Sequence, residues 1–177
     1  GGESTRPGSP AVPLEEEMRR VLPFVQAAVQ FGVPISVDTY KAQVMQAVLD
    51  AGADIINDVW ALRQPGAQSV VASHPQCGVV LMHMHKTPPD MQQTPMQGDA
   101  VAQVQNFLAQ QTQALLALGV ERQRIVWDYG IGFGKTVAQN FALLAHQTAL
   151  TRQGFALLAG WSRKSSLGQV TNRPVEE

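Results

Sequence analysis

The sequence predicts an α/β fold in which repeated strand–helix units build a (β/α)8 TIM barrel. Helical patterns alternate with short β-rich runs along the chain. These runs are mostly apolar and lack polar alternation, which is typical of parallel strands buried on both faces. Such units form either a doubly wound sheet or a barrel. Polar residues follow every run, and this favours the barrel, because a doubly wound sheet gathers its ligand contacts at one switch point.

Four helices are expected, over residues 14–31, 41–51, 100–118 and 140–151, each with apolar residues spaced for one helical face. Pro23 should kink the first of them. Nearly every helix stops at a glycine that suits the left-handed position after a helix. These glycines are Gly32, Gly52, Gly78, Gly119 and Gly154. Residues 86–97 form the one long irregular loop.

Five strands are expected, over residues 33–37, 53–57, 79–82, 125–127 and 155–159. The polar residues that follow them, in order, are Asp38, Asn57 with Asp58, His83 with His85, Asp128 and Lys164. In a barrel, these side chains meet at the carboxyl ends of the strands. Carboxylates, an amide and a lysine within an apolar ring suit a polar heterocycle with several N–H donors.

The composition is that of one ordinary globular domain. The chain has 177 residues, of which 45% are hydrophobic and 15% charged, and its formal net charge is −1. This balance indicates neither a nucleic-acid partner nor an anionic membrane. The single cysteine, Cys77, excludes an internal disulfide, favours a cytoplasmic location and is expected to be a buried structural thiol.

The segment from Ile125 to Lys135 carries the strongest local signal. An apolar run ends at Asp128, and three glycines spaced by two residues follow. A P-loop would need glycine where Tyr129 stands, and a dinucleotide fingerprint would need glycine at Lys135. We therefore interpret the segment as a strand end that opens into another kind of ligand site, the alternative being a simple glycine-rich connection.

Each polar residue also has a structural interpretation. A single strand-end Asp is often only a helix N-cap, although five such positions on five strands argue against that for all of them. His83 and His85 could form a metal pair, a weaker hypothesis because only two other histidines are present. Arg163 and Lys164 could be a solvated turn, but their place after a strand and between serines favours anion binding.

Six motifs resemble one family. They are Gly1-Gly2-Glu3-Ser4-Thr5-Arg6-Pro7-Gly8, Ser36-Val37-Asp38-Thr39, Ile56-Asn57-Asp58-Val59, Leu81-Met82-His83-Met84, residues 128–135, and Ser162-Arg163-Lys164-Ser165. In this order, and spread over the whole chain, they resemble the bacterial dihydropteroate synthases of folate biosynthesis, a pterin-binding family.

The resemblance implies a cytoplasmic homodimer that acts on small molecules, with no nucleic-acid or membrane partner. Members of this family join p-aminobenzoate to (7,8-dihydropterin-6-yl)methyl diphosphate and release diphosphate, and Mg2+ assists the reaction. By resemblance, the pterin-binding residues are Asp38, Asn57, Asp128 and Lys164, of which Asp38, Asp128 and Lys164 are also catalytic. The substrate loop and diphosphate would involve Thr5 and Arg6, and p-aminobenzoate would contact Pro7, Phe133 and Ser165.

Two other functions remain open: a non-catalytic pterin-binding module and a pterin-dependent methyltransferase domain. The motifs at residues 4–7 and 162–165 favour the synthase over the methyltransferase. One departure concerns Tyr129, which stands where the family usually has proline. Proline would bias Asp128 toward an extended backbone, so we predict weaker pterin binding than in a Tyr129→Pro variant.

The second departure is length, because a (β/α)8 barrel takes about 250 residues. The motifs place the start of the chain after the second barrel strand and its end after the seventh. We therefore expect residues 1–177 to be a single pterin-binding domain truncated at both ends, with about strands three to seven. The family's Mg2+ ligand would precede residue 1. Five strands should leave unpaired edges and uncovered apolar faces.

Overall fold

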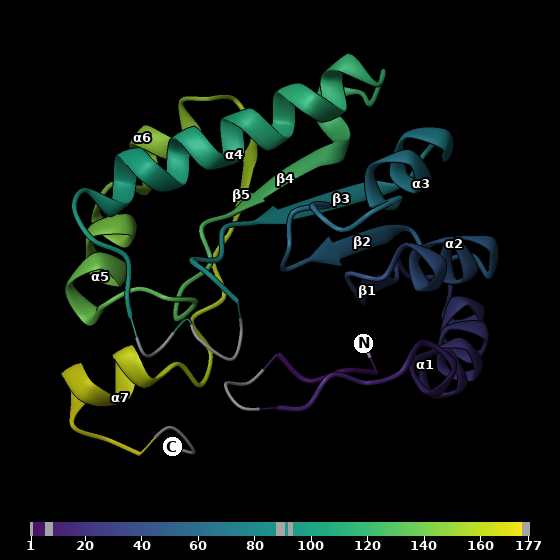
Figure 1. Cartoon of the computed structure of the whole chain (residues 1–177), viewed down its shortest axis with the longest axis horizontal. Coiled ribbons are helices and arrows are strands. Elements are labelled where there is room, and N and C mark those ends of the chain that lie inside the picture. Colours follow the sequence, from purple (N-terminus) through teal and green to yellow (C-terminus); the bar gives the residue numbers. More distant parts are fainter. Residues whose placement is uncertain (1, 6–8, 88–90, 92–93, 175–177) are drawn as a thin grey trace.

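A parallel sheet of five strands organises the part of the chain that the structure describes (Figure 1). The structure, a computed structural model, describes residues 2–5, 9–87, 91 and 94–174. The strands are β1 (Ser36–Asp38), β2 (Ile55–Asp58), β3 (Gly78–Met82), β4 (Ile125–Asp128) and β5 (Ala156–Leu158). Their order is β1-β2-β3-β4-β5, and every neighbouring pair is parallel. Because the order never reverses, the sheet is of the barrel type, as predicted.

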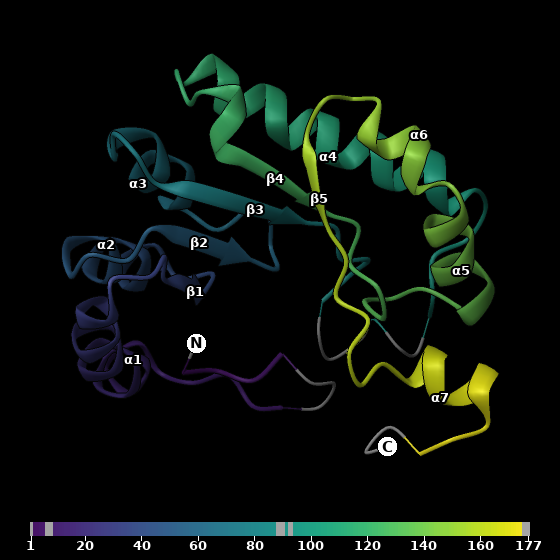
Figure 2. The same cartoon turned by 180° about the vertical axis from the view of Figure 1, so that it is seen from behind.

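Helices lie along an arc on the outside of this sheet (Figures 1 and 2). They are α1 (Leu14–Ala28), α2 (Ala42–Asp50), α3 (Ala67–Ser73), α4 (Ala100–Ala117), α5 (Val137–Ala145), α6 (Gln147–Thr151) and α7 (Ser165–Thr171), with 3-10 turns η1 (Val29–Phe31) and η2 (Arg122–Arg124). Helix α1 contacts α2, α2 contacts α3, and α4 contacts α5. Within the described ranges, no helix has the length and apolar character needed to cross a membrane.

The predicted elements are present, with several corrections to their bounds. Helix α1 runs through Pro23 without a break. The helix expected at 140–151 begins earlier, because Thr136 and Gln139 form a capping box, and it divides at His146 into α5 and α6. Helices α3 and α7 were not predicted. Gly78 is the first residue of β3 and not a left-handed helix end.

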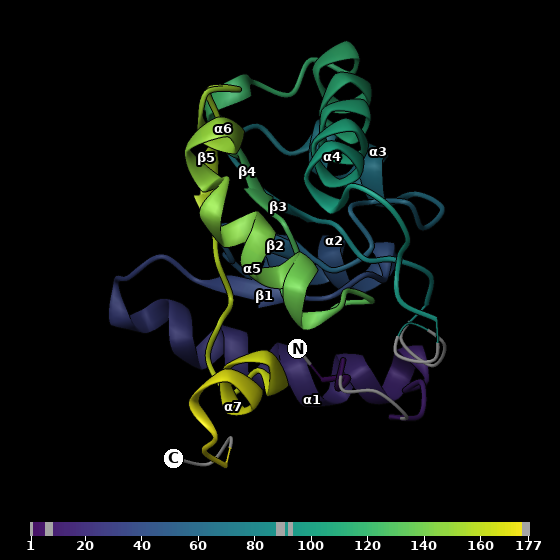
Figure 3. The same ribbon diagram turned by 90° about the vertical axis from the view of Figure 1, so that its left-hand side faces the viewer.

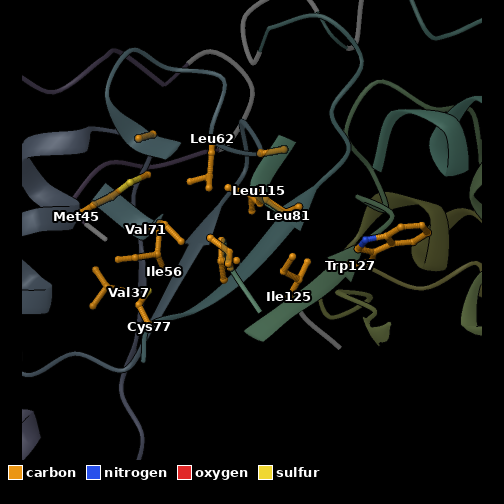
Figure 4. Packing of buried hydrophobic residues seen from close by; sticks show 14 of the residues in the cluster. Val37, Met45, Ile56, Leu62, Val71, Cys77, Leu81, Leu115, Ile125 and Trp127 are labelled. Carbon is orange, nitrogen blue, oxygen red and sulfur yellow. The ribbon is translucent and has the colours of Figure 1, made fainter. Parts of the chain in front are cut away.

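The strand register assigns the side chains to the two faces of the sheet. Val37 pairs with Ile56, and Leu81 pairs with Trp127. These residues belong to the main hydrophobic core, which lies between the sheet and its helices (Figure 4). Since strand side chains alternate, Asp38, Asn57, Met82, Asp128 and Leu158 all point to the opposite, inner face.

The core confirms Cys77 as a buried thiol. Trp127 stacks on Phe155 with 4.9 Å between ring centroids, and its indole N–H donates to Thr112 Oγ1 at 2.8 Å. The expectation that all strands are buried on both faces is wrong for the two edges, where Ser36 of β1 and Ala156 of β5 are exposed. Burial on both faces needs covering layers that the central strands have and the edges here lack.

The loop after β2 is organised by Asp58, whose carboxylate is fully buried. It accepts the N–H groups of Trp60 at 2.8 Å and Leu62 at 2.7 Å. The turn holds Ala61 and Leu62 at positive φ values of 51° and 58°. Burial raises the pKa of this carboxyl group to about 6, although both hydrogen bonds oppose the rise.

We therefore expect stability to fall as the pH rises from about 4 to about 6. The unfolded-state pKa is close to 3.8, so in this window the folded state holds a proton that the unfolded state has released. A shift of about two units corresponds to about 3 kcal/mol. Urea denaturation at about pH 4 and about pH 7 should show that the wild type loses about 3 kcal/mol more than Asp58→Asn. An equal change in both proteins would contradict this account.

Candidate active site

A cavity of about 230 Å³ lies at the carboxyl ends of the strands. Its wall comes from the inner face of the sheet, the loops after β1, β2 and β4, and the amino-terminal segment. The lining residues are Glu3, Thr5, Glu17, Asp38, Thr39, Tyr40, Asn57, Val59, Met82, Asp128, Phe133, Leu158 and Gly160. The amino-terminal segment and α7 both lie at this end of the molecule (Figure 3).

Asp38 and Asn57 form a polar pair at the ends of β1 and β2. The register places them directly opposite each other, and Asn57 Nδ2 donates to Asp38 Oδ1 at 2.8 Å. Asp38 is exposed, whereas Asn57 is half-buried. A carboxylate offers about four lone-pair sites, so Asp38 has capacity for ligand N–H groups beyond the bond from Asn57.

Asp128 ends β4 on the same face, opposite Met82, and is 6% exposed. Its Oδ1 accepts the Gly130 N–H at 2.7 Å, and its backbone carbonyl accepts the His83 N–H at 2.9 Å. Burial raises the pKa of the Asp128 carboxyl group, while the Gly130 N–H, Lys135 and Lys164 act in the opposite direction. A ligand with N–H donors would replace the solvation that this carboxylate has lost.

Phe133 and Lys164 form the wall beyond Asp128. The Phe133 ring lines the cavity, and Lys164 Nζ lies 4.4 Å from the ring centroid. Burial lowers the pKa of Lys164, whereas the charge of Asp128 raises it. Phe133 belongs to a small apolar cluster with Met82, Met84 and Met91. An aromatic ring beside a partly desolvated cation suits an aryl carboxylate or an electron-rich ring.

Glu3 fastens the amino-terminal segment beside the cavity. Its carboxylate accepts from Val12 N at 2.9 Å, Tyr40 OH at 2.9 Å and Lys41 Nζ at 2.6 Å. Lys41 Nζ also lies 2.5 Å from Glu17 Oε2. Burial opposes the charge of Lys41, but hydrogen bonds to Glu17 and Glu3 hold its pKa above the ordinary value.

Several predicted site residues converge on this cavity and others do not. Thr5, Asp38, Asn57, Asp128 and Phe133 line it. Lys164 is not a lining residue, but its Nζ lies over the Phe133 ring, which lines the cavity. Ser165 begins α7, is exposed and does not line the cavity. Arg6 and Pro7 lie outside the described residues.

Sequence reasoning missed the carboxylates of Glu3 and Glu17. Glu3 lies inside a motif of which only Thr5, Arg6 and Pro7 were assigned a function, and Glu17 resembles a solvated helix residue. Glu17 is 1% exposed and accepts from Thr39 Oγ1 at 2.9 Å. No sequence signal pointed to either carboxylate, because their shared partner Lys41 lies 38 residues from Glu3 and 24 residues from Glu17 along the chain.

The histidines build no metal site with those carboxylates that the structure describes. In the described part of the chain, no three His, Cys, Asp or Glu side chains gather so that they could hold a metal ion. His83 is buried against Phe107 in an edge-to-face contact, and burial lowers its pKa. His74 Nδ1 accepts the Cys77 N–H at 2.9 Å, which stabilises a turn.

Tyr129 is fully buried in the main core and does not line the cavity. The Tyr129→Pro variant stays a prediction: it should bind the pterin more tightly, because proline restricts the backbone next to Asp128. It should also lower the free energy of unfolding by about 3 to 5 kcal/mol, because a large buried ring is lost. Calorimetric titration and urea denaturation of both proteins measure the two effects, and equal pterin dissociation constants would remove the idea.

The whole chain, residues 1–177, matches the family model described as pterin binding enzyme. The chain therefore belongs to the pterin-binding enzyme family, and the resemblance seen in its motifs is confirmed. Within that family, its curated relatives include dihydropteroate synthases. It is 41% identical over 180 residues to the dihydropteroate synthase of Haemophilus influenzae, covering 100% of this chain and 64% of that protein. It is 42% identical over 173 residues to the Escherichia coli K12 enzyme, covering 97% and 61%.

Solved structures that are similar to this chain are also dihydropteroate synthases. The Yersinia pestis dihydropteroate synthase, solved as a sulfonamide drug complex, has a TM-score of 0.94 and 41% identity over 99% of this chain and 64% of that chain. The Burkholderia cenocepacia enzyme, complexed with 7,8-dihydropteroate, has a TM-score of 0.89 and 48% identity over 99% and 65%. The chain thus spans about 61 to 64% of the length of these two curated relatives.

Proposed function

We propose that this chain supplies the pterin site of a dihydropteroate synthase, a transferase of folate biosynthesis. The observation that carries the proposal is the convergence of Asp38, Asn57 and Asp128, from three strand ends, on one cavity. The relatives named above are called dihydropteroate synthases. The Yersinia pestis structure is a complex with a sulfonamide drug, and the Burkholderia cenocepacia structure is a complex with 7,8-dihydropteroate.

In this proposal the pterin ring lies against the inner face of the sheet. Its amino and ring N–H groups donate to Asp38 and Asp128, with Asn57 beside Asp38 and Lys164 at the opposite wall. Charge-assisted hydrogen bonds in a partly desolvated cavity are stronger and more directional than those in water. Asp38, Asp128 and Lys164 are catalytic in the sense that they hold the reacting methylene in place.

The reaction needs little covalent help from the protein. The p-aminobenzoate nitrogen forms a bond to the methylene carbon, the bond from that carbon to the diphosphate oxygen breaks, and the amine releases one proton. Orientation of the two substrates and exclusion of water are therefore the main contributions of the protein. Phe133 would contact p-aminobenzoate, while the roles of Thr5 and Arg6 at the diphosphate and of Pro7 and Ser165 at p-aminobenzoate rest on family resemblance.

Mg2+ is implied by the same resemblance and would stabilise the departing diphosphate as a Lewis acid. The described residues do not fit such an ion, since no cluster of three ligating side chains exists among them. No step attributed here to the chain's own residues depends on the metal. With the proposed activity go a homodimer, small-molecule substrates and a cytoplasmic location.

Product formation tests the proposal. The chain is incubated with p-aminobenzoate, the dihydropterin diphosphate and Mg2+, and dihydropteroate is quantified by mass spectrometry. We expect dihydropteroate in amounts that grow with time and protein concentration. Saturable pterin binding without product would instead favour a non-catalytic pterin-binding module. Transfer of a methyl group from a methylated pterin would favour the methyltransferase alternative.

A further inference from the structure

Lys135 closes the glycine-rich loop after β4, and its ammonium group lies inside the protein. The residue is 5% exposed and is not among those that line the cavity. Nζ donates to three backbone carbonyls: Gly130 O at 2.8 Å, His83 O at 3.2 Å and Phe133 O at 3.3 Å. An ammonium group has three N–H donors and no acceptor, so these carbonyls match its capacity.

The three carbonyls come from two segments that lie in direct contact. A Cβ atom at Gly130 would lie 1.9 Å from His83 O, and one at Gly134 would lie 2.7 Å from His85 O. The loop backbone therefore rests on the segment that follows β3. The oxygens of Gly130, His83 and Phe133 all lie within 3.3 Å of one point, Lys135 Nζ, so their partial negative charges repel one another unless a donor lies among them. Lys135 supplies that donor from within the loop itself.

This arrangement is unfavourable for a lysine taken alone. Burial lowers the pKa of Lys135 to about 7, and Lys164 acts in the same direction, whereas Asp128 opposes the shift. A long apolar side chain would fill the same space without burying a charge. The hydrogen bonds made by the ammonium group must therefore serve the position of the loop.

We propose that Lys135 is a positioning residue that fixes the Phe133 ring at the p-aminobenzoate end of the cavity. Lys135 contacts the backbone of Phe133 in two ways. The Phe133 N–H donates at 3.1 Å to Gly130 O, which also accepts from Lys135 Nζ, and the Phe133 carbonyl accepts directly from Lys135 Nζ. The backbone of Asp128 is held by strand pairing with Met82, and Gly130 N–H is its carboxylate's one hydrogen bond to the loop. Loss of the ammonium group should therefore displace Phe133 more than Asp128. The ligands named here rest on the proposed function.

The chain offers a matched control at the other end of β4. The Arg124 guanidinium also donates to three backbone carbonyls, those of Cys77 at 2.7 Å, Val71 at 2.9 Å and His74 at 2.8 Å. Arg124 precedes β4, whereas the cavity lies beyond its carboxyl end. Lys135→Met and Arg124→Met thus remove the same kind of contact at opposite ends of one strand.

Hydrogen–deuterium exchange tests the structural half of the proposal without any ligand. In Lys135→Met, the amides of Phe133 and His85, whose acceptors are Gly130 O and Phe133 O, should exchange about tenfold faster. The amides of β2 and β3 should exchange as in the wild type. Arg124→Met should leave the loop amides unchanged. Unchanged exchange at Phe133 and His85 in Lys135→Met would overturn the proposal.

Kinetics test the functional half. In Lys135→Met, KM for p-aminobenzoate should rise about tenfold, while the pterin dissociation constant changes less than about threefold. Arg124→Met should change neither value. Equal losses for both substrates would assign Lys135 a general structural role and overturn the proposal. If the wild type bound no pterin, the proposed function would fail, and the exchange data would still decide whether Lys135 fixes the loop.

Discussion

Asp128→Asn should raise the pterin dissociation constant about 100-fold while leaving the protein at least as stable at neutral pH. The carboxylate is the most buried acid that faces the cavity from the sheet. A hydrogen bond to a charged group contributes about 1.5 to 3 kcal/mol, and the loss of about 3 kcal/mol corresponds to about 100-fold in affinity. Calorimetric titration of both proteins with the dihydropterin diphosphate measures the change.

The stability part of this prediction follows from the raised pKa of Asp128. A carboxyl group whose pKa is higher in the folded state lowers stability as the pH rises from its unfolded value, near 3.8, through its folded value. Asparagine removes that penalty and can still accept the Gly130 N–H. The variant should therefore gain stability relative to the wild type as the pH rises through that window, and the full gain should be present above it. An unstable variant with unchanged pterin affinity would contradict the role assigned to Asp128.

Gly130→Ala should lower the free energy of unfolding by about 2 to 5 kcal/mol and abolish pterin binding. Gly130 has a φ of +66°, and an added Cβ would lie 1.9 Å from His83 O. The left-handed conformation alone costs about 1 to 2 kcal/mol for alanine, and a clash with backbone adds overpacking strain of about 1 to 3 kcal/mol. Because Gly130 N–H holds Asp128 Oδ1, a displaced loop also misplaces the carboxylate.

Gly119→Ala separates the two contributions. Gly119 has a φ of +85°, but nothing lies within 4 Å of its added Cβ. Urea denaturation should therefore give a loss of only about 1 to 2 kcal/mol for Gly119→Ala, and pterin binding should be unchanged. Equal losses in the two variants would show that backbone strain alone, and not contact with the segment after β3, determines the requirement for glycine at position 130.

The sequence predicted the sheet and the polar residues at its carboxyl end because those features are local. An apolar run followed by Asp128 or Asn57 is readable without knowing what lies nearby, and parallel strands bring such ends together. Helix α3 was missed because it is short and rich in small residues. The start of α5 could have been found from Thr136 and Gln139, which form a capping box.

The contacts that support the site could not be predicted in the same way. Lys135 resembled part of a failed phosphate motif, and only the fold shows that its ammonium group binds backbone carbonyls and that the residue does not line the cavity. Glu17 and Lys41 lie 24 residues apart, and neither position signals its partner. Sequence patterns identify which side chains reach a ligand, whereas the buried groups that hold them depend on three-dimensional contacts.

Calorimetric titration of the wild-type chain with the dihydropterin diphosphate tests the central claim most directly. The protein is first shown to be folded by circular dichroism and by a cooperative urea transition. We expect saturable binding of one pterin per chain that Asp128→Asn weakens about 100-fold and that Arg124→Met leaves unchanged. A folded wild-type chain that binds no pterin, or whose affinity does not depend on Asp128, would contradict a pterin site at the carboxyl ends of these strands.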